Sequence, residues 1–251
     1  MLCFLFAFFS SSSSNALEHI KKNDSDALEV NIDYDQYFKK PKKYKGFYLN
    51  TIIDSITKVN NFDTSNCVII FECVDGYKPL MNFSKLYRSS TPYIVYRDLS
   101  QNAINKWDET IKSKFEPYYL VWDKVSKDDN SYAWPHGLIG FQIISINDSY
   151  RYIYPYTDPS LAGGFTLFRD NCLKCHSINK IGGSIGPELN IPKNIMEYWT
   201  EKDIVSFIKD PASYRYNSRM PAITNVSDKE FTQILKYLNY MKNNKKVSDI
   251  P

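Results

Sequence analysis

The pentapeptide Cys172-Leu173-Lys174-Cys175-His176 constrains this chain more than any other stretch of its 251 residues. Two cysteines followed directly by a histidine form the attachment sequence of a c-type haem. Their spacing of three places both thiols on one side of a helical turn, where they can form thioethers with the two vinyl groups of one porphyrin. His176 follows on the same turn and is placed to ligate the iron as its proximal ligand.

A reduced CxxC redox pair or half of a zinc site would use the same two cysteines. A structural zinc site needs two further Cys or His ligands. The remaining candidates do not form a second pair with suitable spacing: Cys67, Cys73, His19 and His136. The sequence therefore predicts one covalently bound haem c.

The composition is that of a folded protein with nearly balanced charge. Hydrophobic residues make up 43% and aromatic residues 16%, which supports buried cores and argues against disorder. The formal net charge of +3 is too weak to indicate a nucleic-acid partner.

The amino terminus is typical of a signal peptide, which we place at residues 1–16. An apolar run, Leu2–Phe9, precedes a serine run, and the small residues Ser14 and Ala16 stand where a signal peptidase reads the chain. No Lys or Arg precedes the run, so a buried amino-terminal strand is the alternative. The run is too short to span a bilayer. We expect a periplasmic or otherwise exported protein, with peripheral attachment to the membrane as an option and no membrane-spanning segment after cleavage.

Residues 17–152 are predicted to form a β-rich α+β domain. The spacing of apolar residues predicts a helix over Leu49–Val59, and a second helix is expected over Asn102–Phe115. Runs of β-branched and aromatic residues predict four strands: Cys67–Val74, Tyr93–Tyr96, Tyr118–Trp122 and Leu138–Ile146. The stretch from Leu17 to about Pro41 is polar and shows no sustained periodicity.

A basic cluster follows that stretch, and it consists of Lys39, Lys40, Lys42, Lys43 and Lys45. Such runs are usually solvated surface. The alternative is a docking patch that steers an acidic redox partner.

Cys67 and Cys73 are predicted to be buried thiols without a disulfide. On one extended strand they face the same side but lie roughly 20 Å apart. A disulfide joins Cα atoms only about 4.4–6.8 Å apart. They can pair only if Cys67 lies in the preceding turn and the chain folds back.

Three segments of this domain resemble the core of the sulfite-oxidase type of molybdopterin-binding oxidoreductase, over residues 66–146. They are Phe71-Glu72-Cys73-Val74-Asp75-Gly76-Tyr77, Tyr93-Ile94-Val95-Tyr96-Arg97-Asp98 and Pro117-Tyr118-Tyr119-Leu120-Val121-Trp122. The resemblance implies a cysteine thiolate on molybdenum, upstream of the Asp-Gly-Tyr turn. Here the domain is short, and the family's cofactor-binding Arg and His positions have no clear counterpart. We therefore expect a reduced relative that has lost the cofactor. His136 is expected to be a turn residue rather than a ligand.

Residues 153–160 read as an interdomain linker, with Ser160 as a cap for the helix that follows. From there the chain resembles the class I cytochromes c, in the pattern Gly164-x-x-Leu167-Phe168-x-x-x-Cys172. The resemblance implies an all-α domain over residues 161–245, followed by a polar tail at 246–251. It also implies that Gly164 lets the first and last helices cross closely. A capping box, Ser227-Asp228-Lys229-Glu230, predicts the start of that last helix, and Thr200 is expected to cap another over Glu201–Lys209.

The same resemblance suggests how the iron is held. It implies that the carbonyl of Pro187, in the glycine-rich loop 182–189, accepts the ring N–H of His176 and makes it a better donor to iron. Met220 precedes Pro221 in a loop before the last helix, where bacterial class I cytochromes often carry the axial methionine. The other candidates for the sixth position are Met196, Met241 and His136. Tyr214 and Arg215 are candidate contacts of a haem propionate.

We therefore expect an electron-transfer protein of a respiratory chain rather than an enzyme. A His176/Met220 iron is coordinatively closed, which favours one-electron transfer. The amino-terminal domain would dock a partner or act as a scaffold, and the partners would be a donor dehydrogenase and an acceptor cytochrome or oxidase. The alternatives are a molybdopterin enzyme that reduces its own haem and a sensor with an open iron site.

Overall fold

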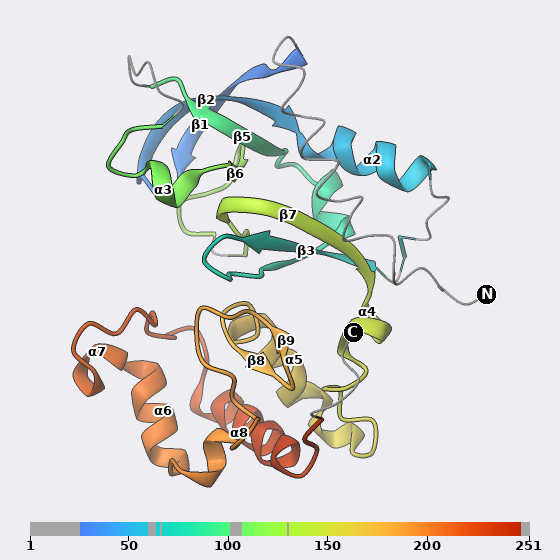
Figure 1. The fold of residues 1–251 in the computed structure, drawn as a ribbon, viewed down its shortest axis with the longest axis vertical. Coiled ribbons are helices and arrows are strands. Elements are labelled where there is room, and N and C mark those ends of the chain that lie inside the picture. The colour runs from blue at the N-terminus through green and yellow to red at the C-terminus, as the bar shows by residue number, and fades with distance from the viewer. Residues whose placement is uncertain (1–25, 60–63, 66, 101–106, 130, 247–251) are drawn as a thin grey trace. The chain divides into compact units, whose positions relative to one another are not determined.

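The computed structural model describes residues 26–59, 64–65, 67–100, 107–129 and 131–246 (Figure 1). The chain divides into two compact units, Met1–Ile146 and Asn147–Pro251. The expected signal peptide lies outside the described residues, as do residues 247–251 of the expected tail.

The amino-terminal unit is built on a seven-stranded sheet in which every neighbouring pair is antiparallel (Figure 1). The strand order is β1-β2-β5-β6-β7-β3-β4. The strands are β1 (Leu28–Asp35), β2 (Lys40–Tyr48), β3 (Cys67–Cys73), β4 (Leu80–Asn82), β5 (Pro92–Asp98), β6 (Tyr118–Trp122) and β7 (His136–Ser145). The helices are α2 (Leu49–Val59), η2 (Phe83–Tyr87) and α3 (Lys112–Phe115).

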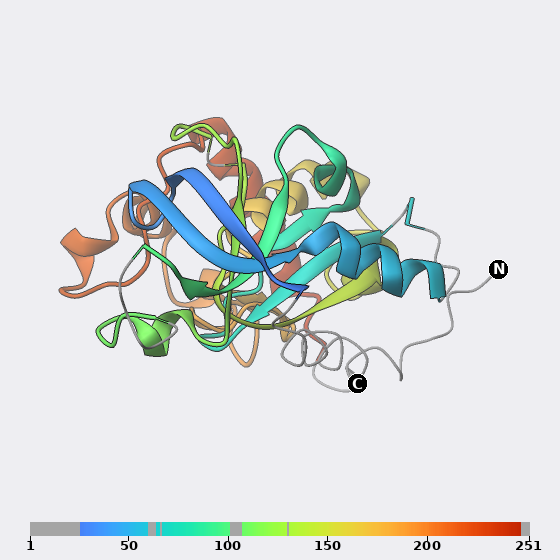
Figure 2. The same ribbon diagram turned by 90° about the horizontal axis from the view of Figure 1, so that it is seen from above.

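The centre of this sheet is covered on both faces. Successive side chains of a strand point to opposite faces. Along β6, Leu120 and Trp122 therefore enter one apolar cluster, while Tyr119 and Val121 enter another. Leu49 and Ile53 of α2 complete the first cluster, and Figure 2 shows this helix continuing from the end of β2.

The predicted strands are confirmed as β3, β5, β6 and β7, and the predicted helix over Leu49–Val59 as α2. The second predicted helix is wrong over its described part, where only Lys112–Phe115 is helical. Trp107 is fully buried, and the carboxylate of Asp108 accepts the backbone N–H of Thr110 at 2.8 Å. This local turn competes with a helix, because a side-chain acceptor replaces the helical carbonyl.

The hairpin β1–β2 occupies a stretch in which no periodicity was evident, and it corrects the interpretation of the basic cluster. Lys42 is buried: its side chain is 1% exposed and forms an ion pair with Asp98 of β5. Strand alternation turns Lys42 inward beside Tyr44, whereas Lys43 points out and pairs with the exposed Glu29 at 2.5 Å. The cluster is therefore not a uniform surface patch.

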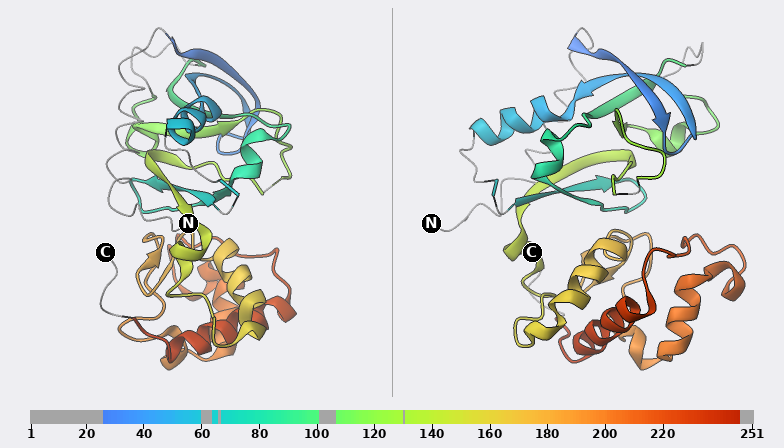
Figure 3. Two further views of the ribbon diagram at one scale, coloured as in Figure 1. Left: turned by 90° about the vertical axis from the view of Figure 1, so that its right-hand side faces the viewer. Right: turned by 180° about the vertical axis from the view of Figure 1, so that it is seen from behind.

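The carboxy-terminal unit is helical. Its elements are η3 (Pro159–Leu161), α5 (Ala162–Asn171), β8 (Ser177–Ile178), β9 (Ile181–Gly182), η4 (Ile195–Glu197), α6 (Glu201–Lys209), α7 (Pro211–Tyr214) and α8 (Asp228–Lys242), after the short helix α4 (Ile146–Tyr150). Figure 3 shows α5 and α8 packed against each other. Both predicted caps are confirmed, Thr200 on α6 and the Ser227/Glu230 capping box on α8. Among the described residues, no helix has the length and apolar character needed to cross a membrane.

The stretch expected as a linker, residues 153–160, packs within the carboxy-terminal unit instead. Ile153 is fully buried, and its carbonyl accepts the hydroxyl of Tyr237 at 2.9 Å. Tyr154 packs edge-on against Phe165, with ring centroids 5.2 Å apart. The helix cap expected at Ser160 is also wrong, since the carboxylate of Asp158 accepts the N–H of Ser160 and caps η3.

Candidate haem-attachment site

The Cys-x-x-Cys-His stretch forms a helical turn directly after α5. The N–H of Cys172 donates to the carbonyl of Phe168 at 2.8 Å, and the N–H of His176 donates to that of Cys172 at 2.9 Å. Cys172 is buried and Cys175 half-buried, and neither forms a disulfide. Burial raises the pKa of the Cys172 thiol to about 12. The backbone hydrogen bonds therefore keep the two cysteines and the histidine on one helical turn.

The glycine-rich loop wraps closely around this turn. A β-carbon on Gly182, whose φ is +126°, would lie 2.3 Å from the carbonyl oxygen of His176. One on Gly183 would lie 2.3 Å from that of Lys174, and one on Gly186 would lie 2.3 Å from Cε1 of His176. Because real β-carbons do not approach so closely, glycine is required for the loop to enclose the histidine.

The ring of His176 lies against the carbonyl that the resemblance to class I cytochromes c implied. Its Nδ1 lies 2.9 Å from the carbonyl oxygen of Pro187. A carbonyl only accepts, so Nδ1 carries the proton and Nε2 keeps its lone pair. No other described residue donates to or accepts from Nε2. Burial lowers the pKa of His176, and the bond to Pro187 opposes this effect. A neutral imidazole with an available Nε2 is the form that binds a metal.

The same segment has the signature of a known family. Residues 161–242 match the family described as cytochrome c. The carboxy-terminal part of this chain is a c-type cytochrome domain. The match supports a haem-based electron-transfer protein and implies covalently bound haem c. No curated protein and no solved structure matches the chain.

The residues of the cytochrome domain fit that cofactor. Cys172 and Cys175 would attach the haem and His176 would be its proximal ligand, with the Pro187 carbonyl against the imidazole. Phe168 is fully buried, with its ring 5.5 Å from that of Tyr237 on α8, as expected for an aromatic between the two helices.

Among the candidates for the sixth ligand, Met220 is half-buried in the loop between α7 and α8. Met241 is 1% exposed in the packed face of α8. Met196 lies in η4, where its backbone N–H donates to the side chain of Asn194 at 2.8 Å. His136 starts β7 in the other unit, with its ring 5.2 Å from that of Phe115 and 5.7 Å from that of Tyr37.

A ladder of buried asparagines supports the haem loop, and the sequence analysis missed it. Asn190 donates to the side-chain oxygen of Asn179 at 2.7 Å, and Asn194 donates to that of Asn190 at 2.7 Å. Asn194 also donates to the carbonyl of Leu238 on α8 at 3.0 Å. All three asparagines are fully buried. Polar residues in a loop have no periodicity that would announce such burial.

The resemblance of the amino-terminal unit to a molybdopterin-binding oxidoreductase finds no support in the comparisons. Cys67 and Cys73 lie at the two ends of β3 inside an apolar cluster, and neither forms a disulfide, as predicted. Burial, with Asp75 and Glu72 adding to it, raises the pKa of Cys73 to about 12, so this thiol is protonated in the structure.

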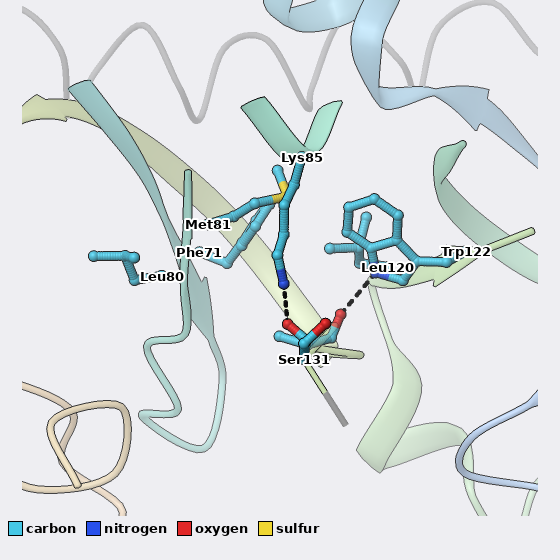
Figure 4. A pocket seen from close by; sticks show the side chains of 8 residues that line it. Phe71, Leu80, Met81, Lys85, Leu120, Trp122 and Ser131 are labelled. Carbon is cyan, nitrogen blue, oxygen red and sulfur yellow. Dashed lines mark hydrogen bonds between the residues drawn. The ribbon is translucent and has the colours of Figure 1, made fainter. Parts of the chain in front are cut away.

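A pocket near these strands, shown in Figure 4, is too small for an organic cofactor. Its volume of about 10 Å³ is room for about one water molecule. The ammonium of Lys85 enters it and donates to the carbonyl of Ser131.

Proposed function

We propose that this protein is an exported one-electron carrier with one haem c, ligated by His176 and Met220. The haem, when attached, supplies the one-electron couple of its iron. The protein's own residues hold and orient it. The contact between Nδ1 of His176 and the Pro187 carbonyl carries this proposal, because it fixes the tautomer that a proximal ligand needs.

Met220 is the sixth ligand that the side-chain positions favour. Met241 fills the core of the domain, where a thioether usually serves as packing. Met220 lies in an irregular loop, half-buried, directly before Pro221. His/Met ligation closes the iron and favours a relatively positive potential, which suits electron transfer rather than oxygen chemistry.

The experiment is absorption spectroscopy of the ferric holoprotein. Met220→Ala should remove the methionine–iron charge-transfer band at the red end of the spectrum, while the matched control Met196→Ala should keep it. Persistence of the band in Met220→Ala would assign the ligand elsewhere. A high-spin, carbon-monoxide-binding ferrous form of the unaltered protein would instead support an open-site sensor.

Export is supported by the signal-like sequence 1–16 and by the haem, because c-type haem is attached outside the cytoplasm in bacteria. The amino-terminal sequence of the mature holoprotein tests it. A mature chain that begins at Leu17 is the expected result.

We propose that the amino-terminal unit docks or holds redox partners, a donor dehydrogenase and an acceptor cytochrome or oxidase. Purification of the exported holoprotein with its bound proteins, followed by redox titration, tests this role. Metal analysis of the same sample provides the decisive contrast. A molar ratio of molybdenum to haem near one would contradict this proposal and support an oxidoreductase that reduces its own haem.

A further inference from the structure

We infer that Glu188 is a positioning residue for the haem ligand His176. Its carboxylate joins the turn between β8 and β9 to the backbone after Pro187, and so holds the Pro187 carbonyl on Nδ1 of the histidine. The inference rests on the proposed function in so far as His176 ligates the haem iron. It does not depend on which residue is the sixth ligand.

Four backbone N–H groups donate to this carboxylate. Oε1 accepts those of Asn179 at 3.0 Å, Asn190 at 2.8 Å and Ile191 at 3.3 Å. Oε2 accepts that of Lys180 at 2.9 Å. Hydrogen bonds to an ionised acceptor are roughly twice as strong as neutral ones. One half-buried side chain therefore connects two stretches of chain that lie about ten residues apart.

The turn is shaped to receive an anion. Asn179 has a φ of 51° and Lys180 a φ of 65°, so two consecutive residues are left-handed. Both positions are positive in a type I′ hairpin turn, and left-handed backbone is unfavourable for residues other than glycine. Successive N–H groups of a turn can converge to form an anion-binding concavity. Here Asn179 and Lys180 each direct an N–H at one oxygen of Glu188.

We call Glu188 and its four backbone N–H donors the clamp. It lies next to His176 in both stretches of the chain that it joins. Ser177, the residue after His176, forms a parallel bridge with Glu188. The N–H of Leu189 donates to the carbonyl of Ser177 at 2.9 Å. His176 and Pro187 each directly precede this bridge, so fixing the bridge fixes their mutual distance. The asparagine ladder begins at Asn179 and ties the assembly to α8 through Asn194.

Loss of the carboxylate should weaken the bond between Pro187 and His176. In Glu188→Gln the side-chain amide keeps one acceptor oxygen. It presents an NH₂ group in place of Oε2, which accepts the backbone N–H of Lys180. A less tightly held imidazole is a poorer donor to iron, which disfavours the ferric state. Loss of a negative charge from the loop that contacts His176 acts in the same direction. The reduction potential should therefore rise.

The test is redox titration of holoprotein, with Glu201→Gln as the control. Glu201 is an exposed carboxylate in the first turn of α6, in the same unit, so its replacement makes the same change in net charge. At a fixed poise, Glu188→Gln should lower the ratio of ferric to ferrous haem by about threefold or more, a modest effect among those of outer-shell partners. Glu188→Asp, which keeps the charge on a shorter side chain, should lie in between.

A second readout follows the histidine itself by proton NMR. The ring Nδ1–H of His176 should exchange faster with solvent in Glu188→Gln than in Glu201→Gln. Equal potentials and equal exchange in the two variants would overturn the inference. If Glu188→Gln fails to fold, the amide protons of Asn179 and Lys180 in unaltered holoprotein still decide. Slow exchange supports the clamp, and exchange at the rate of exposed amides contradicts it. Absence of the methionine–iron band from the unaltered protein would contradict the proposed function and leave this inference untouched.

Discussion

Gly164 on α5 lies so close to α8 that a β-carbon there would be 2.3 Å from the carbonyl oxygen of Gln233. The same β-carbon would also lie 2.9 Å from the carbonyl carbon of Gln233 and 3.1 Å from Cβ of Tyr237. A backbone carbonyl inside a helix cannot swing aside as a flexible side chain can. The crossing of the two helices therefore depends on this glycine, as the resemblance to class I cytochromes c implied.

Gly164→Ala should destabilise the cytochrome domain by about 1–3 kcal/mol, because overpacking forces the helices apart. Gly163→Ala is the matched control. Its β-carbon would meet only the flexible side chain of Gln233, at 2.8 Å from Oε1, and alanine favours the helix. Denaturant unfolding followed at the haem absorption band measures both variants. An equal loss of stability in the two variants would show that the close crossing of the helices is unimportant.

Gly186→Ala should disturb iron ligation rather than overall stability. The added β-carbon would lie 2.3 Å from Cε1 and 2.6 Å from Nδ1 of His176, so the imidazole must tilt or leave its bond to Pro187. We expect the ferric haem to gain high-spin character, seen by absorption and electron paramagnetic resonance. Ser184→Ala, an exposed position of the same loop, should leave the spectrum unchanged. An unaltered low-spin spectrum in Gly186→Ala would contradict the described packing.

Local sequence patterns predicted the elements whose formation depends on residues close together in the chain. The capping box at Ser227 gave the start of α8, and the attachment motif gave the helical turn at His176, because each is a short-range signal. The apolar run of β6 indicated a strand, since both of its faces are covered.

The features that escaped prediction depend on distant partners. Nothing beside Lys42 in the chain indicates that Asp98, fifty-six residues later, receives its ammonium in the core. Glu188 and Asn179 look like ordinary loop residues until the hairpin turn brings their groups together. Residues 153–160 have the composition of a linker, but Tyr237 holds Ile153 in the core of the carboxy-terminal unit.

Lys42→Met should destabilise the amino-terminal unit by about 3–5 kcal/mol, because it leaves the carboxylate of Asp98 buried without its cation. The neighbouring Lys43→Met is the control, since its exposed pair with Glu29 is worth at most about 1 kcal/mol. Replacing both partners, with Lys42→Met and Asp98→Leu, should recover most of the loss. Native-state hydrogen exchange of β2 and β5 reports these changes. Similar costs for the two single variants would disprove the burial of Lys42.

Acidification should weaken the amino-terminal unit through His136. Burial lowers its pKa from the usual 6.5, and the charge of Lys114 lowers it further, against a smaller opposing effect of Asp75. The unfolded chain therefore binds a proton at a higher pH than the folded one. The free energy of unfolding of the unit is therefore unaffected by His136 above about pH 6.5, and it declines as the pH falls below that value. Its ring packs against Phe115 and Tyr37, so the protonated form is costly to bury.

His136→Gln removes the titration and keeps a polar side chain, so it isolates this contribution from that of the carboxylates. Hydrogen exchange of β6 and β7, corrected for intrinsic rates, should show that protection falls between about pH 6.5 and pH 5.5 in the unaltered protein. In His136→Gln the decline should be smaller across the same interval. His176 does not account for the decline in protection, because a histidine bound to haem iron does not take up a proton over this range. A decline of equal steepness in both proteins would place the acid sensitivity elsewhere in the unit.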